Sequence, residues 1–460
     1  MTQPLDELAA QVWTLAGGAA DVAAQLTVSG PRTFLPSAFD VTGLATASVA
    51  AAALAAAEYH AARNDSPVAA VRADSRAACA AFAAEGLFTP VGWSLPDIWD
   101  PIAGNYQARD GWIRLHTNYA SHRAAVTGLL KADDRDSVLA AVSRWKAADL
   151  EAAVVAAGGC AAAMYDRDSW LASVPGAASA AAPAFAVTER PLPGESGAAR
   201  AERPAGRPYA GVRVLDLTRV IAGPIATRFL AAYGADVLRI DPPGFAEVPA
   251  ILPETTAGKR TAAVSLTTPA GRTTFERLVA EADVLVTGLR ADALGRLGYD
   301  DTTLTALNPA LIIASHNAYG WDGPWRGRRG FDSLVQMSCG IAATGGGDAP
   351  APLPVQALDH ATGYLLAAAV GRALAARLTH GTVSRVLASV IGTANLLWSL
   401  PRPADLGDVP SMPRREEFQL VDTRTAWGKA RRIPVPGEIA GTAPELRIEA
   451  GPLGRHQPAW

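Results

Sequence analysis

Residues 356–378, QALDHATGYLLAAAVGRALAARL, place an acid and a histidine at the start of an apolar helical pattern. From Tyr364 onward, Leu, Ala and Val follow one another at helical density, which predicts a buried core helix. Asp359 would lie near the start of this helix, where a carboxylate accepts hydrogen bonds from unpaired N–H groups and suits the helix dipole. Capping is therefore its default role, and the rest of the chain must show whether it has a chemical one.

Basic residues in the second half of the chain gather at predicted strand ends and in loops. Each one alone is most simply a solvated side chain. Together they could hold a phosphorylated ligand at the carboxyl ends of parallel strands, where open sheets bind ligands. The residues concerned are Arg219, Arg239, Arg296, Arg326, Arg328 and Arg329.

Several familiar cofactor sites are disfavoured. Residues 211–241 read as strand, loop, helix and strand ending on Asp241, as in a dinucleotide site, but the Gly-rich turn is missing and Pro224 stands in its place. The chain contains no G-x-x-x-x-G-K-[ST], H-E-x-x-H or G-x-S-x-G motif. Its seven histidines form no ligand cluster, so we expect no metal.

The elements that would position these residues alternate between strand and helix. Strand patterns at 211–218, 236–241, 262–267, 283–289 and 310–318 are separated by helical patterns that include 225–235 and 270–282. Alternation with short connections predicts βαβ units and a parallel, doubly wound sheet.

The part before this sheet is mainly helical in pattern. Residues 39–67 resemble 358–384, because both run from Asp through Thr-Gly to an Ala-rich helix and a short strand. Whether this similarity is a true duplication stays open, since Ala-rich helices resemble one another by chance. Residues 101–172 predict a compact α+β unit, and the Pro, Gly, Ala and Ser content of 173–208 predicts a linker.

Composition and charge disfavour nucleic-acid-binding, membrane and secreted proteins. A net charge of −3 and a pI near 6.2 give no basic field for nucleic acid or an anionic membrane. Three separated cysteines suit a reduced cytoplasm, and the acidic start MTQPLDELAAQVW is unlike a signal peptide. The Ala-rich run GLATASVAAAALAAAEYHAA predicts a buried helix rather than a membrane span. We therefore expect a soluble, cytoplasmic protein.

Four segments of the sequence resemble motifs of a known protein family. The segments VRVLDLTRVIAGPIATRFLAAYGADVLRID, KRTAAVSLTTPAGRTTFERLVAEADVLVTGLRADALGRLG, LNPALIIASHNAYGWDGPW and GFDSLVQMSCGIAATGG resemble consecutive motifs of the family III CoA-transferases, the CaiB/BaiF type. This family includes formyl-CoA and carnitine CoA-transferases and the α-methylacyl-CoA racemases. The match extends from about residue 209 to 385. More weakly, 105–172 resembles the small domain of the family and 428–457 its C-terminal return segment.

The resemblance implies an α/β fold: a doubly wound, Rossmann-like parallel sheet with a smaller α+β domain, in a rearranged order. In the family the small domain follows the Asp helix, whereas here it precedes the nucleotide-binding half, as if a truncated first copy were joined to a second copy without one. The expected parts are a helical segment 1–100, a small domain 101–172, the linker 173–208, a CoA-binding domain 209–400 and the return segment 401–460.

The resemblance also implies site residues. Asp359 matches the nucleophile, which forms a mixed anhydride with the acyl group and then an aspartyl-CoA thioester. It must be ionised, which a helix start favours, and the loop Gly345–Gly347 could supply N–H donors. His360 would line the pocket. CoA contacts would come from Arg219, Val220, Ile221 and Ala222, and contacts to its adenosine phosphates from Arg239, Leu266, Arg296 and Arg329. Family members form homodimers, so a homodimer is expected here.

Three departures from the family pattern bear on function. Pro242 and Gly288 replace a basic residue and an Asn, which could weaken CoA binding. Phe331 replaces the His of the racemase motif, and a racemase needs a second acid/base, so this residue disfavours that branch. The leading interpretation is an acyl-CoA:carboxylate CoA-transferase that uses CoA thioesters as substrates and no metal. The alternatives are a racemase or isomerase on the same scaffold, or a non-catalytic CoA-binding subunit.

Overall fold

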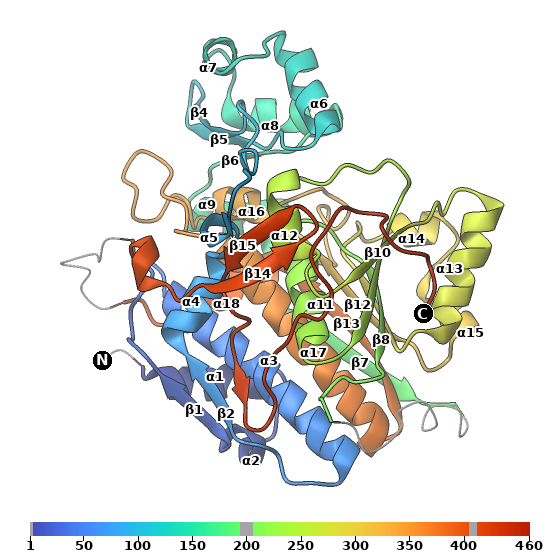
Figure 1. Cartoon of the computed structure of the whole chain (residues 1–460). Coiled ribbons are helices and arrows are strands. Elements are labelled where there is room, and N and C mark those ends of the chain that lie inside the picture. The colour runs from blue at the N-terminus through green and yellow to red at the C-terminus, as the bar shows by residue number, and fades with distance from the viewer. Residues whose placement is uncertain (1–2, 194–205, 404–411) are drawn as a thin grey trace.

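The computed structural model describes residues 3–193, 206–403 and 412–460, and its centre is a seven-stranded sheet (Figure 1). Six strands are parallel and one edge strand is antiparallel. The strand order is β10 (Arg260–Ala263), β9 (Asp236–Asp241), β8 (Arg213–Leu217), β11 (Val284–Thr287), β12 (Ile312–Asn317), β13 (Thr382–Ser389) and β7 (Phe185–Pro191). From β8 the chain adds β9 and β10 on one side and then crosses to β11 on the other side of β8. The carboxyl ends of β8 and β11, where the chain changes direction across the sheet, are the expected ligand site of such a sheet.

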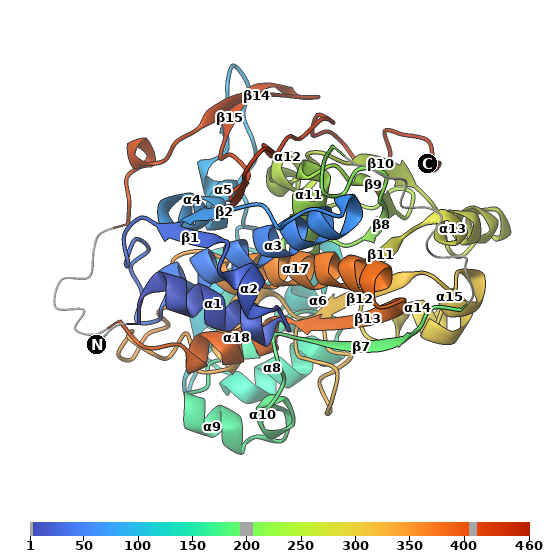
Figure 2. The same cartoon turned by 90° about the horizontal axis from the view of Figure 1, so that it is seen from below.

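Helices cover both faces of the sheet (Figures 1 and 2). Val214, Val284 and Ile312 share a core with α11 (Ala222–Ala232) and α17 (Ala357–Thr379) on one face. Their neighbours Leu215 and Leu285 share a second core with α13 (Pro269–Glu281) and α15 (Asp301–Leu307) on the other. Burial on both faces explains why these strands are continuously apolar. The predicted α/β, doubly wound architecture is confirmed.

Helix α3 (Val41–Asn64) lies beside α17, and the two form the centre of the larger core (Figure 2). By length and apolar composition α3 could cross a membrane, but 94% of its most apolar window is buried inside the protein. Its alanines allow the close approach of a neighbouring helix. The helix predicted to be buried is therefore part of the protein core.

The predicted small α+β unit stands apart from the large core and has a core of its own (Figure 1). Strands β4 (Gly104–Gln107), β5 (Trp112–Leu115) and β6 (Ala161–Ala163) form an antiparallel sheet. Helices α6 (Ala120–Leu130), α7 (Arg135–Val142) and α8 (Ala147–Ala156) pack against it. Tyr119 and His122, at the start of α6, lie on the side of the unit that faces the large sheet.

Two sequence predictions need correction. The predicted linker 173–208 contains α10 (Val174–Ser179) and strand β7, which pairs antiparallel with β13; residues 194–205 lie outside the described residues. Pro191 is tolerated because it ends an edge strand, where one side of the backbone needs no ladder partner. The expected strand at 262–267 is instead Arg260–Ala263, so Leu266 lies beyond its end.

The first hundred residues are not only helical, which is a further correction. Strands β1 (Leu26–Ser29) and β2 (Val71–Asp74) pair in parallel, and β16 (Glu438–Ile439) from the C-terminal segment joins them. Likewise β3 (Thr89–Pro90) pairs with β15 (Gly428–Arg432), which pairs with β14 (Val421–Thr425). The short strand expected after the Ala-rich helix corresponds to β2. The other strands were missed because each is at most five residues long, and β1, β3 and β16 depend on partners remote in sequence.

Candidate active site

Asp359 is the third residue of α17 and does not cap it. The N-cap position is Gln356, whose side chain makes no capping bond, and the Asp359 side chain makes no hydrogen bond with any described residue. Only 7% of Asp359 is exposed. Its carboxylate lies on the lining of two neighbouring cavities, so the capping role expected by default is wrong.

A second carboxylate lies beside the first. Asp332 begins α16 (Asp332–Ser338), is fully buried, and accepts a hydrogen bond of 2.9 Å from the backbone N–H of Asp359. The amide of Gln336 donates to its other oxygen, and the Gln336 carbonyl oxygen accepts from the Leu353 N–H at 2.7 Å. Asp332 thus holds the first turn of α17, and with it Asp359, in place.

Burial governs how these acids ionise. Burial raises the pKa of Asp332 to about 6. Burial raises the pKa of Asp359 well above its ordinary value, and the charges of Asp332 and Glu85 raise it further. The helix start was expected to favour the ionised form, but in the ligand-free protein desolvation and two neighbouring acids outweigh it. Asp359 is therefore a carboxyl group that holds its proton unusually strongly.

His360 lines neither cavity and contacts Glu85 instead, contrary to the pocket-lining role expected for it. Its Nε2 lies 3.0 Å from Glu85 Oε2, and its ring stacks on Phe82 with centroids 5.1 Å apart. Burial alone would raise the pKa of Glu85, but the charge and hydrogen bond of His360 outweigh burial and lower it. Glu85 belongs to α5 (Ala84–Leu87), in the N-terminal part of the chain, and reaches the first of the two cavities.

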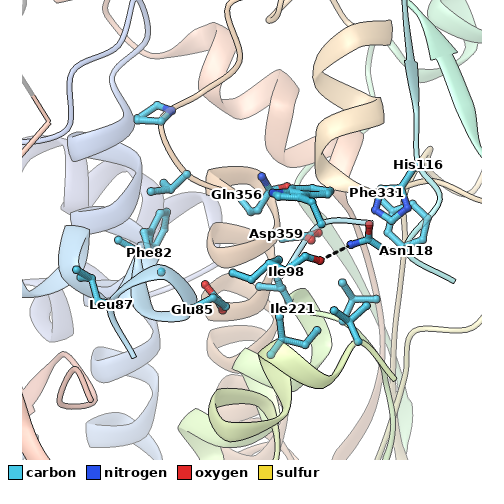
Figure 3. A pocket seen from close by; sticks show the side chains of 18 of the residues that line it. Phe82, Glu85, Leu87, Ile98, His116, Asn118, Ile221, Phe331, Gln356 and Asp359 are labelled. Carbon is cyan, nitrogen blue, oxygen red and sulfur yellow. Dashed lines mark hydrogen bonds between the residues drawn. The ribbon is translucent and has the colours of Figure 1, made fainter. Parts of the chain in front are cut away.

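The first cavity, here called the apolar cavity, has a volume of about 360 Å³ (Figure 3). Figure 3 shows Asp359 at its centre, with Phe82, Glu85 and Leu87 on one side and His116, Asn118 and Phe331 on the other. The Asn118 amide donates to the Ile98 carbonyl at 2.9 Å and ties the small unit to the segment that precedes it. The other apolar lining residues include Trp99, Val248, Ile251, Met412 and Phe418.

The second cavity, here called the arginine cavity, has a volume of about 420 Å³ and lies at the carboxyl ends of β8, β11 and β12. Its cationic side chains are Arg219, Arg290, Arg328 and Arg329. Arg328 is already paired with Glu151 at 2.6 Å, which leaves the other three as the more available cations. Both cavities share a short list of lining residues: Tyr119, Val220, Ile221, Phe331 and Asp359.

Five of the residues predicted to contact CoA line the arginine cavity: Arg219, Val220, Ile221, Ala222 and Arg329. Arg219 stacks over Phe245 at 3.8 Å and lies 3.6 Å from Asp241. Val220 has a φ of +64°, a left-handed conformation that is rare for a β-branched residue. Its N–H donates to Glu247 Oε2 at 3.1 Å, which helps to hold this conformation.

The other three predicted contacts do not line either cavity. Arg239 is fully buried and paired with Asp241 at 2.8 Å and Glu247 at 3.2 Å. Leu266 packs against the core beneath α13. Arg296 is half exposed and paired with Asp292 on its own helix. The loop Gly345–Gly347, expected to donate N–H groups, also lines neither cavity.

Sequence reasoning missed residues from two places. Arg290 follows strand β11 directly, so its place at the carboxyl end of a predicted strand was a usable signal. His116, Asn118, Tyr119 and His122 follow β5 and come from the small unit. Nothing in the sequence shows that this unit turns these side chains toward the sheet. The N-terminal half therefore lines both cavities.

Gly288, one of the departures from the family pattern, leaves a space that the His316 side chain occupies. A Cβ at position 288 would lie 2.4 Å from His316 Nε2, so the imidazole fills the space that a side chain would need. Burial lowers the pKa of His316 to about 4, and the ring is therefore neutral at neutral pH. His316 lines the arginine cavity at the end of β12.

The part of the chain that the structure describes holds no group of three or more His, Cys, Asp or Glu side chains that could bind a metal ion. The ligands available in the two cavities are instead arginines, neutral imidazoles and carboxyl groups.

Comparison with known proteins finds similarity over the second half of the chain. Residues 209–415 match the family model of CoA-transferase family III. The chain is 33% identical over 204 residues to the probable fatty acyl-CoA transferase Rv3272 of Mycobacterium tuberculosis, covering 41% of this chain and 52% of the relative. It is 35% identical over 187 residues to the succinate–glutarate CoA-transferase of Agrobacterium fabrum, covering 36% and 47%.

The chain spans about half the length of the curated relatives it matches. A solved structure of a CaiB/BaiF family protein from Brucella suis is 26% identical, with a TM-score of 0.38 over 48% of this chain and 64% of that one. From residue 209 to residue 415, this chain is therefore similar to the proteins of CoA-transferase family III.

Proposed function

We propose that this protein is an acyl-CoA:carboxylate CoA-transferase in which Asp359 forms a covalent thioester with CoA. The observation that carries this proposal is the place of Asp359, whose carboxyl group lies where an arginine-lined cavity meets an apolar one. A nucleophile for a thioester needs access to the CoA sulfur on one side and to the acyl carbon on the other. Relatives named as CoA-transferases support the same activity.

The arginine cavity suits the phosphorylated end of CoA. Arg219, Arg290 and Arg329 line it, and guanidinium groups form charge-assisted, often bidentate bonds with phosphate. The cavity lies where the strand order reverses, the usual ligand position in such sheets. With the phosphates there, the thioester would reach Asp359 and the acyl group would enter the apolar cavity.

The proposed reaction proceeds through two exchanges. Asp359 first releases its proton to solvent; its carboxylate then attacks the acyl carbonyl carbon and CoA thiolate leaves, which gives a mixed anhydride. The thiolate then attacks the Asp359 carbonyl carbon and releases the donor acid as its carboxylate, leaving an aspartyl-CoA thioester. The acceptor carboxylate attacks that thioester, the thiolate leaves, and its attack on the acceptor acyl carbon frees Asp359 and forms the new acyl-CoA.

Hydroxylamine trapping tests the covalent step. The protein is incubated with an acyl-CoA donor and then with hydroxylamine, and the peptide that contains residue 359 is examined by mass spectrometry. We expect a hydroxamate at Asp359, none in Asp359→Asn, and none at Asp40, which begins the similar helix α3. Normal CoA transfer by Asp359→Asn would overturn the proposal, because an amide cannot form the thioester.

A racemase or isomerase is kept as a second candidate because of one observation. His116 lines the apolar cavity with Asp359 and stacks on Phe331 at a centroid distance of 3.6 Å. Burial holds the pKa of His116 well below its ordinary value, so its neutral imidazole can accept a proton. It could thus supply the second acid/base that Phe331 cannot.

Deuterium incorporation separates the two candidates. A 2-methylacyl-CoA is incubated with the protein in deuterium oxide, with wild type compared to His116→Gln. Transfer of CoA to an acceptor without deuterium at the α-carbon supports the transferase. Deuterium incorporation that His116→Gln abolishes supports the racemase, and failure of both reactions favours the non-catalytic CoA-binding subunit.

A further inference from the structure

The apolar cavity differs from the arginine cavity in having no cation. Its lining is mainly aromatic and aliphatic, and at about 360 Å³ it lies in the size range of small-molecule sites. No lysine or arginine belongs to its described lining.

The ionisable groups in this cavity are acidic or neutral. Besides Asp359, they are Glu85, His116 and Tyr119. His360 lowers the pKa of Glu85 against the effect of burial, so Glu85 is an anion at neutral pH, whereas burial keeps His116 neutral. Burial also raises the pKa of Tyr119, so this phenol stays uncharged. A ligand in the cavity therefore faces the Glu85 carboxylate, which is paired with His360, and neutral polar groups, but no cation of the described lining.

A buried cation behind this cavity is committed elsewhere. Arg228 contributes to the field at Glu85, but its guanidinium is 2.9 Å from Glu254 and it does not line the cavity. The side-chain amide of Gln356, just before α17, has no hydrogen-bond partner among the described residues, and neither has Nδ1 of His116. The cavity thus offers few free polar contacts for a carboxyl group, and none of them is a cation.

We propose that the apolar cavity selects acyl groups of hydrophobic monocarboxylic acids, with a medium alkyl chain or an aryl group, and excludes dicarboxylates. This choice of substrate class rests on the proposed transferase function. The carboxyl carbon lies at Asp359 and Gln356, and the remainder of the acyl group lies against Phe82, Ile98 and Phe331. A second carboxylate would lose its hydration and meet no cation of the described lining, and such burial is costly.

Two CoA thioethers of equal chain length provide the direct test. S-butyl-CoA and S-(3-carboxypropyl)-CoA differ only by a terminal carboxylate, and neither can react with Asp359. By calorimetry we expect S-butyl-CoA to bind at least tenfold more tightly than S-(3-carboxypropyl)-CoA, and S-octyl-CoA more tightly still. Equal or tighter binding of the carboxylated thioether would overturn the proposed selectivity.

Variants locate the effect in this cavity. Ile98→Arg adds the missing cation and is expected to reverse the preference in favour of S-(3-carboxypropyl)-CoA. Leu139→Arg adds the same charge on an exposed position of the small unit and should change nothing. If Ile98→Arg does not fold, Trp99→Ala removes a half-exposed wall of the cavity and should weaken S-octyl-CoA binding while leaving that of CoA unchanged.

Free acids separate failure of this proposal from failure of the proposed function. Octanoate and phenylacetate are titrated against succinate and glutarate without any CoA. If CoA does not bind but octanoate binds at least tenfold more tightly than succinate, the transferase is refuted and the cavity assignment stands. If CoA binds and succinate binds as well as octanoate, the cavity assignment is refuted and the transferase stands.

Discussion

Two aspartates at similar helix starts have opposite surroundings. Asp40, before α3, accepts a hydrogen bond of 2.8 Å from the Gly43 N–H and is paired with Arg32 at 2.7 Å. Asp359, in the first turn of α17, lacks a capping bond among the described residues and faces two cavities. Asp40 accepts a hydrogen bond from the first turn of its helix, and Arg32 neutralises its charge. Asp359 is instead held in place through its backbone N–H, which donates to Asp332. This contrast supports Asp359 as the reactive group of the two.

The raised pKa values of Asp332 and Asp359 predict how stability depends on pH. An unfolded Asp releases its proton near pH 4, whereas Asp332 holds its proton to about pH 6 in the folded state and Asp359 holds its own longer. Between these values the folded state binds more protons, so the free energy of unfolding falls as pH rises. Melting temperatures of the ligand-free protein should decrease from pH 4 through pH 6 and above because of these groups.

Asp359→Asn isolates this contribution. The amide does not titrate, so the proton that the folded state holds at Asp359 no longer contributes, and the decrease in melting temperature over this range should become smaller. Gln356→Ala, which changes an uncharged neighbour, should keep the wild-type pH profile. A profile that is unchanged in Asp359→Asn would contradict the raised pKa of Asp359.

Two arginines separated by six positions test the phosphate site. Arg290 lines the arginine cavity, whereas Arg296 is half exposed and paired with Asp292. A charge-assisted bond contributes about 1.5–3 kcal/mol, so Arg290→Ala should weaken CoA binding about tenfold or more. Arg296→Ala should leave the affinity near that of wild type. Calorimetry with CoA measures both, and the reverse ranking would remove Arg290 from the site.

Site residues could be predicted where motif and backbone position coincide. Residues 219–222 come just after strand β8, so their backbone lies at its carboxyl end whatever conformations their side chains adopt. Arg239 lies inside a strand, where the direction of a side chain depends on register, and here it is buried against Asp241 and Glu247. Acidic partners of this kind cannot be read from a sequence, because both are placed by tertiary structure.

At the scale of elements, the contact between α11 and α17 brings the loop 219–222, which is proposed to contact CoA, next to Asp359. Gly363 permits it, because a Cβ there would lie 2.5 Å from the Ala222 carbonyl oxygen. Gly363→Ala must push the two helices apart, at a cost of about 1–3 kcal/mol as for other overpacked cores. We expect a lower melting temperature and weaker CoA binding.

Gly128→Ala is the matched control for this prediction. Gly128 lies within α6, and nothing lies within 4 Å of a Cβ built there. The change should be neutral or stabilising by about 0.4–1 kcal/mol, because it reduces the entropy of the unfolded chain. Equal effects of the two substitutions would show that the α11–α17 contact is not close enough to matter.

Elements with strong local patterns could be predicted, and those that depend on remote partners could not. The strands β8, β9, β11 and β12 are continuously apolar and alternate with helices. Strand β7 is largely exposed at the sheet edge, and its composition resembled a linker. Its pairing with β13, almost two hundred residues later, carries no local signal.

At the scale of the molecule, the candidate site is assembled from both halves of the chain. The half after residue 206 supplies six of the seven strands, the arginines and Asp359. The half before 193 supplies the edge strand β7 and the lining residues Phe82, Glu85, His116, Asn118 and Tyr119. The sequence indicated a rearranged order but not where the first half would pack. Helix α3 lies along α17, and strand β16 completes the β1–β2 sheet, so each half covers apolar surface of the other.

This mutual coverage predicts that the halves stay together when the chain is cut. A protease site introduced between residues 193 and 206 is cleaved in the native protein, and the product is analysed on a sizing column and for CoA binding. Because α3 and α17 bury each other in one continuous core, both fragments should elute together at the size of the uncut protein and bind CoA with similar affinity. The uncut protein on the same column tests the homodimer expected from the family resemblance, by its mass against that of one chain. Separate elution of the fragments, with CoA binding retained by the second alone, would show that the first half is dispensable for the site.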